Sequence, residues 1–160
     1  MTQLDKSAAV ARSQLGAELD PAECAALAAK MGVQPMREGE LVVSEGEGRR
    51  TLFVLAEGRL SVCKGDGPQE SCLYQLRVGE CAGRRAFLDG SERKAMLRAD
   101  TDGTLLTLEP EDFESLIDSH PWLVYKVMRA LFRVTHTNLM RMNLESAELR
   151  NYLMKTGGRY

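Results

Sequence analysis

Residues 52–62 read Leu-Phe-Val-Leu-Ala-Glu-Gly-Arg-Leu-Ser-Val, two runs of strand-forming residues on either side of Gly58. Similar short runs occur along the middle of the chain: Leu41–Val43, Thr51–Leu55, Leu60–Cys63, Cys72–Leu76, Ala95–Arg98 and Thr104–Leu108. The turn signals between them are Gly46-Glu47-Gly48, Gly65-Asp66-Gly67, Asp89-Gly90 and Asp102-Gly103. Evenly spaced short strands with glycine-containing turns are typical of an antiparallel roll or barrel. The pattern therefore predicts a β-roll over residues 33–108.

Helical patterns flank the predicted roll. Residues 1–32 contain two of them: Leu4–Leu15, and a helix that begins at Asp20-Pro21 and ends at Gly32. Asp20 is the expected N-cap of the second helix, and Glu23 completes a capping box. Residues 109–153 contain a short helix, Glu111–Asp118, and a long one from Pro121 to about Leu153. We expect one domain over residues 1–160 of mixed α and β class, an antiparallel double-stranded β-helix (a jelly-roll-like β-roll) flanked by N-terminal helices and a long C-terminal helix.

The long C-terminal helix extends farther than one roll can cover. At 1.5 Å per residue it is about 45 Å long, against about 30 Å for a small domain. Two apolar stripes occupy its first half: Leu123, Val127, Ala130 and Val134, and Val124, Met128, Leu131 and Thr135. Only the second stripe continues, through Asn138, Met142, Glu145 and Leu149. This pattern predicts packing on the roll and a homodimer through the helix; the alternative is an ordinary core helix with a frayed end.

Composition excludes several classes of function. Apolar residues make up 44% of the chain and charged residues 28%, as in ordinary globular proteins. The net charge of −2 lacks the positive excess that a nucleic-acid binder needs. No apolar run approaches the ~20 residues that span a bilayer, and residues 1–15 do not resemble a signal peptide. We expect a cytoplasmic protein with no membrane contact and no direct DNA binding.

The cysteines are predicted to be free thiols. They are Cys24, Cys63, Cys72 and Cys81, and none forms a C-x-x-C pair or clusters with histidine, so no metal site is expected. Cys63 and Cys72 flank a turn symmetrically, so the alternative is a pair facing each other across a hairpin, which a redox sensor would use. A reducing cytosol favours free thiols. His120 and His136 have no nucleophile at a suitable spacing, which indicates a non-catalytic protein.

Three segments together resemble the cyclic nucleotide-binding domain family, particularly the sensor half of catabolite-activator-type bacterial regulators. They are Gly39–Glu47, Leu52–Val62 and Gly83-Arg84-Arg85-Ala86-Phe87-Leu88-Asp89-Gly90-Ser91-Glu92-Arg93-Lys94-Ala95. The third looks like the family's phosphate-binding cassette, within residues 79–99. The resemblance implies a β-roll sensor that binds a cyclic nucleotide (cAMP or cGMP) or a related anion and signals through an unknown downstream protein partner. The family's DNA-binding domain would begin about where this chain stops, at Tyr160.

The resemblance also implies a set of ligand-binding residues: Gly83, Arg84, Arg85, Ala86, Arg93, Lys94, Ala95 and Asn138. Arg93 corresponds to the arginine that pairs with the cyclic phosphate by charge-assisted hydrogen bonds. Backbone N–H groups of a short helix after Gly83 would face the same anion. Asn138 falls where the activators place a base-contacting threonine, and its amide both donates and accepts. The alternative role of Asn138 is to fix the register of a dimer seam.

The cassette departs from the family in ways that leave two hypotheses. Arg84 replaces a glutamate that accepts a hydrogen bond from the ribose 2′-hydroxyl, and Met96 removes a hydroxyl that usually follows Ala95. A register with Gly79-Glu80 as the glycine–glutamate pair places the carboxylate too far from Arg93. In one hypothesis the pocket binds a more highly charged anion, using Arg84, Arg85, Arg93 and Lys94. In the other it has decayed, Arg84 faces solvent, and the chain serves dimerisation or protein interaction.

Overall fold

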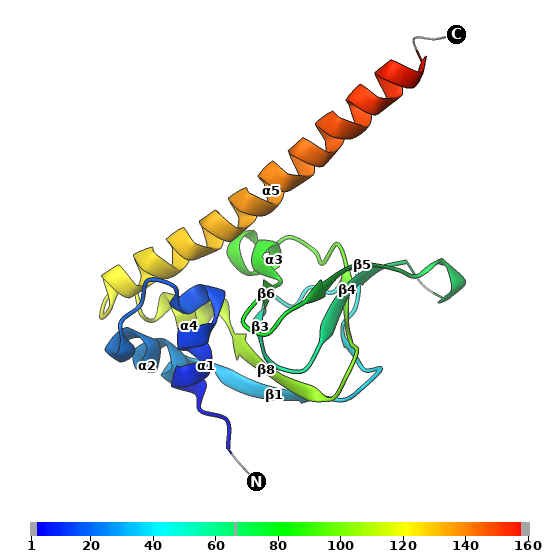
Figure 1. Ribbon diagram of the computed structural model, residues 1–160. Helices are drawn as coiled ribbons and strands as arrows, with labels where there is room; N and C mark the ends of the chain where they lie inside the picture. Colours follow the sequence, from blue (N-terminus) through cyan, green and yellow to red (C-terminus); the bar gives the residue numbers. More distant parts are fainter. Residues whose placement is uncertain (1–2, 66, 158–160) are drawn as a thin grey trace.

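The computed structural model describes residues 3–65 and 67–157 and has the predicted mixed α and β architecture (Figure 1). Within these residues eight strands form two antiparallel sheets, in the orders β1-β8-β3-β6 and β2-β7-β4-β5. The strands are β1 (Gly32–Met36), β2 (Leu41–Val43), β3 (Leu52–Glu57), β4 (Leu60–Lys64), β5 (Ser71–Leu76), β6 (Cys81–Ala82), β7 (Met96–Ala99) and β8 (Gly103–Leu108). The predicted β-roll is confirmed.

Two of the strands were not predicted from the sequence. β1 contains Pro35, which cannot donate to a ladder, but β1 lies at the edge of its sheet and pairs only with β8. Edge strands tolerate proline. β6 is two residues long and pairs with Phe53 and Val54 of β3. Such a short strand has no periodicity of its own, so only its pairing identifies it.

Strand β3 joins two hydrophobic layers. Leu52, Val54 and Ala56 belong to a cluster that includes residues of the helices, while Phe53 and Leu55 belong to the cluster inside the roll. Successive side chains of a strand point to opposite faces of the sheet. A strand covered on both faces is therefore apolar at every position, which explains the unbroken run at residues 52–56.

Helices cover the outer face of the sheet that contains β3. They are α1 (Lys6–Arg12), the 3₁₀ turn η1 (Gln14–Gly16), α2 (Pro21–Lys30) and α4 (Pro110–Glu114); a second 3₁₀ turn, η2 (Gly67–Gln69), lies in the β4–β5 hairpin. The capping box of α2 is confirmed, because Asp20 and Glu23 each accept a hydrogen bond from the other's backbone N–H. α1 ends before the predicted Leu15, because Ser13 is extended and its hydroxyl donates to the carbonyl of Val10.

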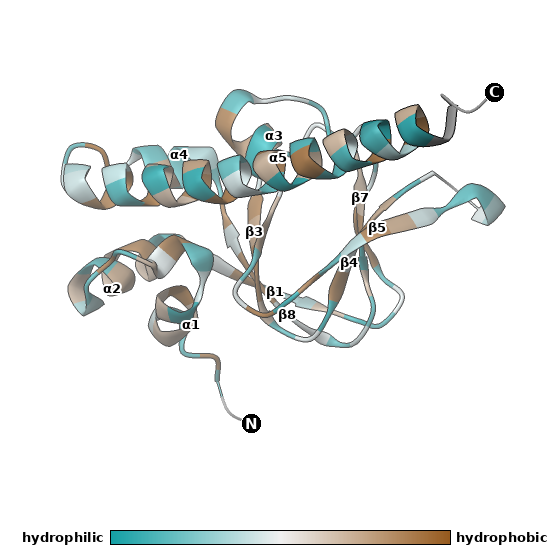
Figure 2. Ribbon diagram, turned by 45° about the horizontal axis from the view of Figure 1, so that its top comes forward, coloured by the Kyte–Doolittle hydropathy of each residue, from teal (hydrophilic) through white to brown (hydrophobic). Residues whose placement is uncertain are grey.

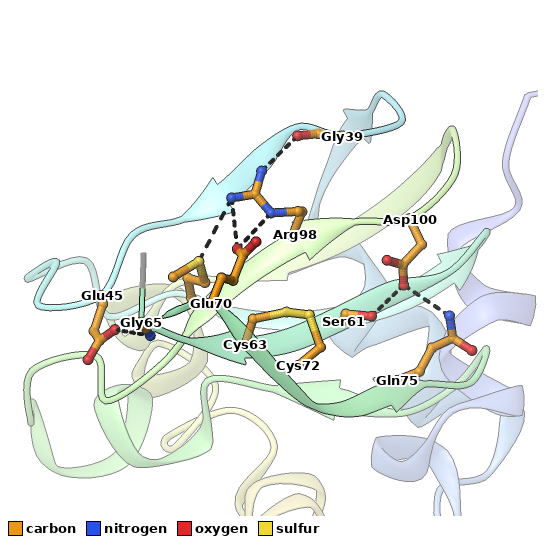
Figure 3. The surroundings of a disulfide bond; sticks show 11 residues. Gly39, Glu45, Ser61, Cys63, Gly65, Glu70, Cys72, Gln75, Arg98 and Asp100 are labelled. Carbon is orange, nitrogen blue, oxygen red and sulfur yellow. Dashed lines mark hydrogen bonds and ion pairs between the residues drawn. A yellow bond between two sulfur atoms is a disulfide. The ribbon is translucent and has the colours of Figure 1, made fainter. Parts of the chain in front are cut away.

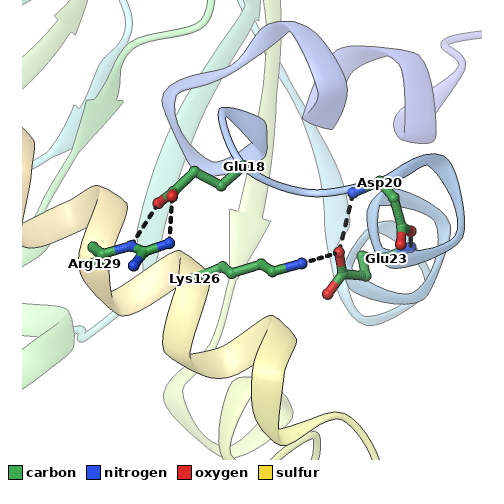
Figure 4. Close-up of polar contacts among 5 residues, drawn as sticks. All are labelled: Glu18, Asp20, Glu23, Lys126 and Arg129. Atoms are coloured by element: carbon green, nitrogen blue, oxygen red, sulfur yellow. Dashed lines mark hydrogen bonds and ion pairs between the residues drawn. The ribbon is translucent and has the colours of Figure 1, made fainter.

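The last helix, α5 (Pro121–Gly157), leaves the body of the molecule after its first third (Figures 1 and 2). Lys126 and Arg129 pair with Glu23 and Glu18, which attaches this first part to the N-terminal helices (Figure 4). The second stripe was predicted to continue to a partner helix, and at Leu131 this prediction is wrong. Leu131 is only 1% exposed and lies in the core. Figure 2 shows hydrophobic residues continuing along the projecting part of α5.

A disulfide joins Cys63 and Cys72, so the prediction of free thiols at these positions is wrong (Figure 3). The two cysteines lie opposite each other because β4 and β5 are consecutive strands of one hairpin. Cys24 and Cys81 are free and buried. The alternative of a facing pair is therefore the correct one.

Among the described residues, we find no helix with the length and hydropathy required to cross a bilayer.

Candidate functional site

The predicted cassette begins with a glycine that must approach other groups closely. Gly83 is the N-cap of α3 (Arg84–Asp89) and has a left-handed backbone, with φ of 88°. A Cβ at this position would lie 2.4 Å from Nη1 of Arg93 and 2.9 Å from the carbonyl oxygen of Thr51. Both contacts are shorter than any side chain tolerates. The absence of a side chain at Gly83 is therefore what lets Arg93 reach the start of α3.

Arg93 is buried at the centre of the cassette, with 7% of its surface exposed. Nη2 donates to the carbonyl of Thr51 at 2.6 Å, and Nη1 donates to the carbonyl of Gly83 at 3.3 Å. The guanidinium also lies 5.8 Å from the centroid of the Phe53 ring. Burial lowers the pKa of Arg93, and the charge of Glu47 opposes that shift. The Arg93 guanidinium is thus a buried positive charge held by two hydrogen bonds to backbone carbonyls.

One donor of Arg93 is left without a partner. Nε is the one buried side-chain nitrogen or oxygen in the described part of the chain that makes no hydrogen bond. A buried donor without an acceptor costs about 1–3 kcal/mol, and such groups occur where a ligand or ion binds. The arrangement therefore offers a buried, charge-assisted N–H to an acceptor that the chain does not supply.

A polar network around Thr51 holds the loop that carries Arg93 against the start of β3. The Thr51 hydroxyl donates to Glu109 at 2.6 Å and accepts from Nε of Arg49 at 2.9 Å. The loop backbone is fixed as well, because the N–H of Arg93 donates to the carbonyl of Glu47. The roles of Thr51 and Glu109 at this site were not predicted from the sequence. The two residues are 42 residues before and 16 residues after Arg93, and no motif connects them.

The structure separates the other basic residues of the cassette. Arg84 is half-buried, and its Nη1 donates to the carbonyl of Cys81 at 3.3 Å. Arg85 and Lys94 are exposed. Ala86 is buried and its carbonyl accepts from Arg50, while Ala95 is half-buried. Of the predicted site residues, Gly83 and Arg93 are therefore in contact, and Arg84 is turned back along β6.

Asn138 lies on the projecting part of α5 and is half-buried. One turn farther, Arg141 helps to line a groove of about 860 Å³ between α5 and β5. The other lining residues are Leu73, Tyr74, Gln75, Arg77, Val78 and Glu80. This groove was not predictable from the sequence, because its walls come from segments more than 60 residues apart.

Glu80, the carboxylate of the alternative register, is already engaged in this groove. One oxygen accepts from the Tyr74 hydroxyl at 2.6 Å, and the other accepts from the backbone N–H of Arg77 at 2.9 Å. The hydrogen bond to Glu80 raises the pKa of Tyr74. Glu80 therefore stabilises the β5–β6 turn.

Comparison with known proteins identifies the family. A family model described as cyclic nucleotide-binding domain matches residues 33–120, more than half of the chain. The chain belongs to the cyclic nucleotide-binding domain family. The resemblance inferred from the three sequence segments is thus confirmed.

Relatives of this cyclic nucleotide-binding domain occur in larger proteins. The human potassium/sodium hyperpolarization-activated cyclic nucleotide-gated channel 3 is 29% identical over 140 residues, or 88% of this chain, which spans only 17% of the channel. The catabolite activator protein of Thermus thermophilus has a TM-score of 0.70 and 29% identity, over 84% of this chain and 63% of that protein. A cyclic nucleotide-binding domain from Methylobacillus flagellatus shares the fold, with a TM-score of 0.75 and 18% identity over 85% and 77% of the two chains.

Proposed function

We propose that this domain is a non-catalytic sensor that binds a cyclic nucleotide, or a related phosphate-bearing anion, beside Gly83 and Arg93. The observation that carries the proposal is the buried, unpaired Nε of Arg93. A phosphate oxygen is the acceptor best suited to a guanidinium N–H. The first N–H groups of a helix such as α3 also lack intrahelical partners and favour an anion. The bound state would be transmitted to a partner protein.

The experiment is a calorimetric titration of the domain with cAMP and with cGMP. In the Arg93→Lys variant the positive charge stays but the guanidinium N–H groups are lost. Hydrogen bonds to charged groups contribute about 1.5–3 kcal/mol, so we expect binding to weaken roughly 10- to 100-fold. Thermal unfolding of the variant checks that the contacts of Arg93 with Thr51 and Gly83 are not needed for folding.

The matched control for this titration is Arg37→Lys, which makes the same replacement at an exposed arginine in the turn between β1 and β2. Like Arg93→Lys it keeps the net charge, but it does not touch the cassette, so binding should stay at the wild-type level. A folded Arg93→Lys protein that binds cAMP as tightly as the wild type contradicts the assignment of Arg93.

A second candidate function is a domain that has lost nucleotide binding and serves dimerisation or protein interaction. The observation in its favour concerns Arg84, which replaces the carboxylate that would accept a hydrogen bond from a ribose hydroxyl. Arg84 donates to the carbonyl of Cys81 instead. A wild-type protein that binds neither cAMP nor cGMP in the same titration, at any concentration tested, supports this candidate.

We propose in addition that α5 forms a homodimer with a second copy of the chain. Its projecting part presents an apolar stripe at Met128, Phe132, Leu139, Met142 and Leu149, each between 40% and 69% exposed. Thr135 and Ser146 occupy the two intervening positions, and the spacing alternates between four and three residues. This spacing is the heptad pattern of a coiled-coil seam. Compared with the stripe predicted from the sequence, Phe132, Leu139 and Ser146 replace Leu131, Asn138 and Glu145. Val124 is left out, because it packs against the core.

A further inference from the structure

The β4–β5 hairpin contains a β-bulge next to the disulfide. The pairing runs Lys64 with Ser71 and Cys63 with Cys72, and then Val62 with Tyr74. Leu73 therefore has no residue opposite it on β4. An extra residue of this kind bends the strand and redirects its side chains, and bulges are frequent beside functional sites.

The bulge helps to build the groove beneath α5. Leu73 and Tyr74 are consecutive residues, yet both line this groove. Gln75, the next residue, lines it as well. An extra residue in a strand redirects the side chains next to it, so the bulge shapes this wall of the groove. The opposite wall contains Arg141 of α5. The shape of the groove therefore depends on the register of β5 at Cys72.

The disulfide is placed where it can hold this register (Figure 3). β5 is an edge strand and pairs only with β4. On the hairpin side Glu70 pairs with Arg98 of β7 at 2.9 Å, and toward the other end of β5 Gln75 donates to Asp100 at 3.0 Å. Between these two contacts, the Cys63–Cys72 bond joins β5 to β4 covalently.

We propose that Cys63 and Cys72 are a reversible redox couple that controls the groove between β5 and α5. The oxidised pair fixes the bulge at Leu73, and the reduced pair releases β5 and changes the groove wall. The inference does not depend on ligand binding at the cassette. Disulfides of proteins kept in a reducing compartment are generally transient and used in redox sensing, which is the setting predicted for this chain.

The exposure of the two cysteines determines how the exchange proceeds. Cys63 is fully buried and Cys72 is exposed. A glutathione thiolate attacks Sγ of Cys72 and breaks the S–S bond, and Cys63 leaves as a thiolate that takes up a proton. A second glutathione thiolate attacks the glutathione sulfur of the mixed disulfide and releases the Cys72 thiolate, which is also protonated. One protein disulfide is reduced, and two glutathione molecules become glutathione disulfide.

The test uses the full chain, first treated with glutathione disulfide and then with excess reduced glutathione. N-ethylmaleimide added together with urea, and read by mass spectrometry of the separate peptides, counts the free thiol at each cysteine; Cys24 and Cys81 are free in both states, so the difference reports on Cys63 and Cys72. Hydrogen exchange of residues 71–78 reports on β5. We expect no label on the oxidised pair, two labels after reduction, and exchange in this segment on the order of tenfold faster. Exchange in α2 should not change.

Two variants serve as matched controls. In the double variant Cys63→Ser, Cys72→Ser, residues 71–78 should exchange at the reduced rate whether or not glutathione is present. Cys24→Ser removes a buried thiol outside the hairpin and should respond like the wild type. Three results each overturn the proposal: thiols that remain free after oxidation, a bond that survives reduced glutathione in the native chain, or reduction without a change of exchange in residues 71–78.

Discussion

At the scale of single residues, two arginines of the cassette show how surroundings determine a role. Arg93 is buried against Thr51, Gly83 and Phe53, and one of its donors remains unpaired. Arg84 is half-buried and donates to the carbonyl of Cys81. An arginine is thus a candidate anion ligand at position 93, whereas at position 84 it binds the backbone of β6. Only the first role was predictable from family register.

The role of Arg84 can be tested by restoring a carboxylate. In Arg84→Glu, the new side chain can accept a hydrogen bond from a ribose hydroxyl, which a guanidinium cannot do. We expect cAMP affinity to rise roughly tenfold, measured by calorimetry, because hydrogen bonds to charged groups contribute about 1.5–3 kcal/mol.

The control for this variant is Arg85→Glu, which makes the same charge change at the adjacent, exposed position. It should bind cAMP no more tightly than the wild type. Equal affinities of the two variants would show that the carboxylate acts only through charge, and that Arg84 does not block a ribose site.

At the scale of elements, α5 changes its surroundings along its length. Its first turns have Leu123, Val127, Ala130 and Leu131 in the core. Beyond them the helix projects, and large apolar residues such as Met142 and Leu149 are exposed. The amphipathic pattern of the sequence predicted the two parts. It did not predict that Leu131 faces the core while Phe132, the next residue, faces outward.

Leu131→Ala should lower the free energy of unfolding by about 2–5 kcal/mol, because it removes buried methyl groups and leaves a cavity. The measurement is urea denaturation. Met140→Ala is the control, since Met140 is exposed on the same helix and lies outside the dimer stripe; we expect a change within about 0.5 kcal/mol. Similar losses for both variants would mean that Leu131 does not pack as described.

At the scale of the whole molecule, the fold presents three separate surfaces to possible partners. The cassette lies around Arg93, the groove lies between β5 and α5, and the apolar stripe follows the projecting part of α5. A second α5 packed on the stripe would also come close to the groove, because Arg141 directly precedes Met142 of the stripe. Self-association and the groove are therefore expected to influence each other.

Two leucines of α5 provide a matched test of the homodimer. Leu139 lies on the stripe, and Leu144, five residues later, is rotated about 140° away from it. Both side chains are more than half exposed. Light scattering should give a dimer mass for the wild type and for Leu144→Glu, and a monomer mass for Leu139→Glu. A wild type that is monomeric at high concentration, or a Leu139→Glu protein that remains dimeric, contradicts the seam.

The sequence by itself determined the β-roll and the helices on either side of it. These depend on local features: turn glycines, a capping box and runs of alternating or continuous apolar residues. β1 and β6 were missed because Pro35 obscured the first and the second is only two residues long. Of the residues that the family register grouped as a site, Arg93 and Gly83 are in contact in the structure.

Only the tertiary structure decided the contacts between distant segments. It placed the carbonyl of Thr51 against Arg93, formed the groove between β5 and α5, and turned Leu131 into the core. It also closed the disulfide that the expected reducing conditions argued against. The physical reason is that the packing of the whole core sets the register of the strands and the rotation of the helices. Short sequence patterns carry no information about the free energy of that packing.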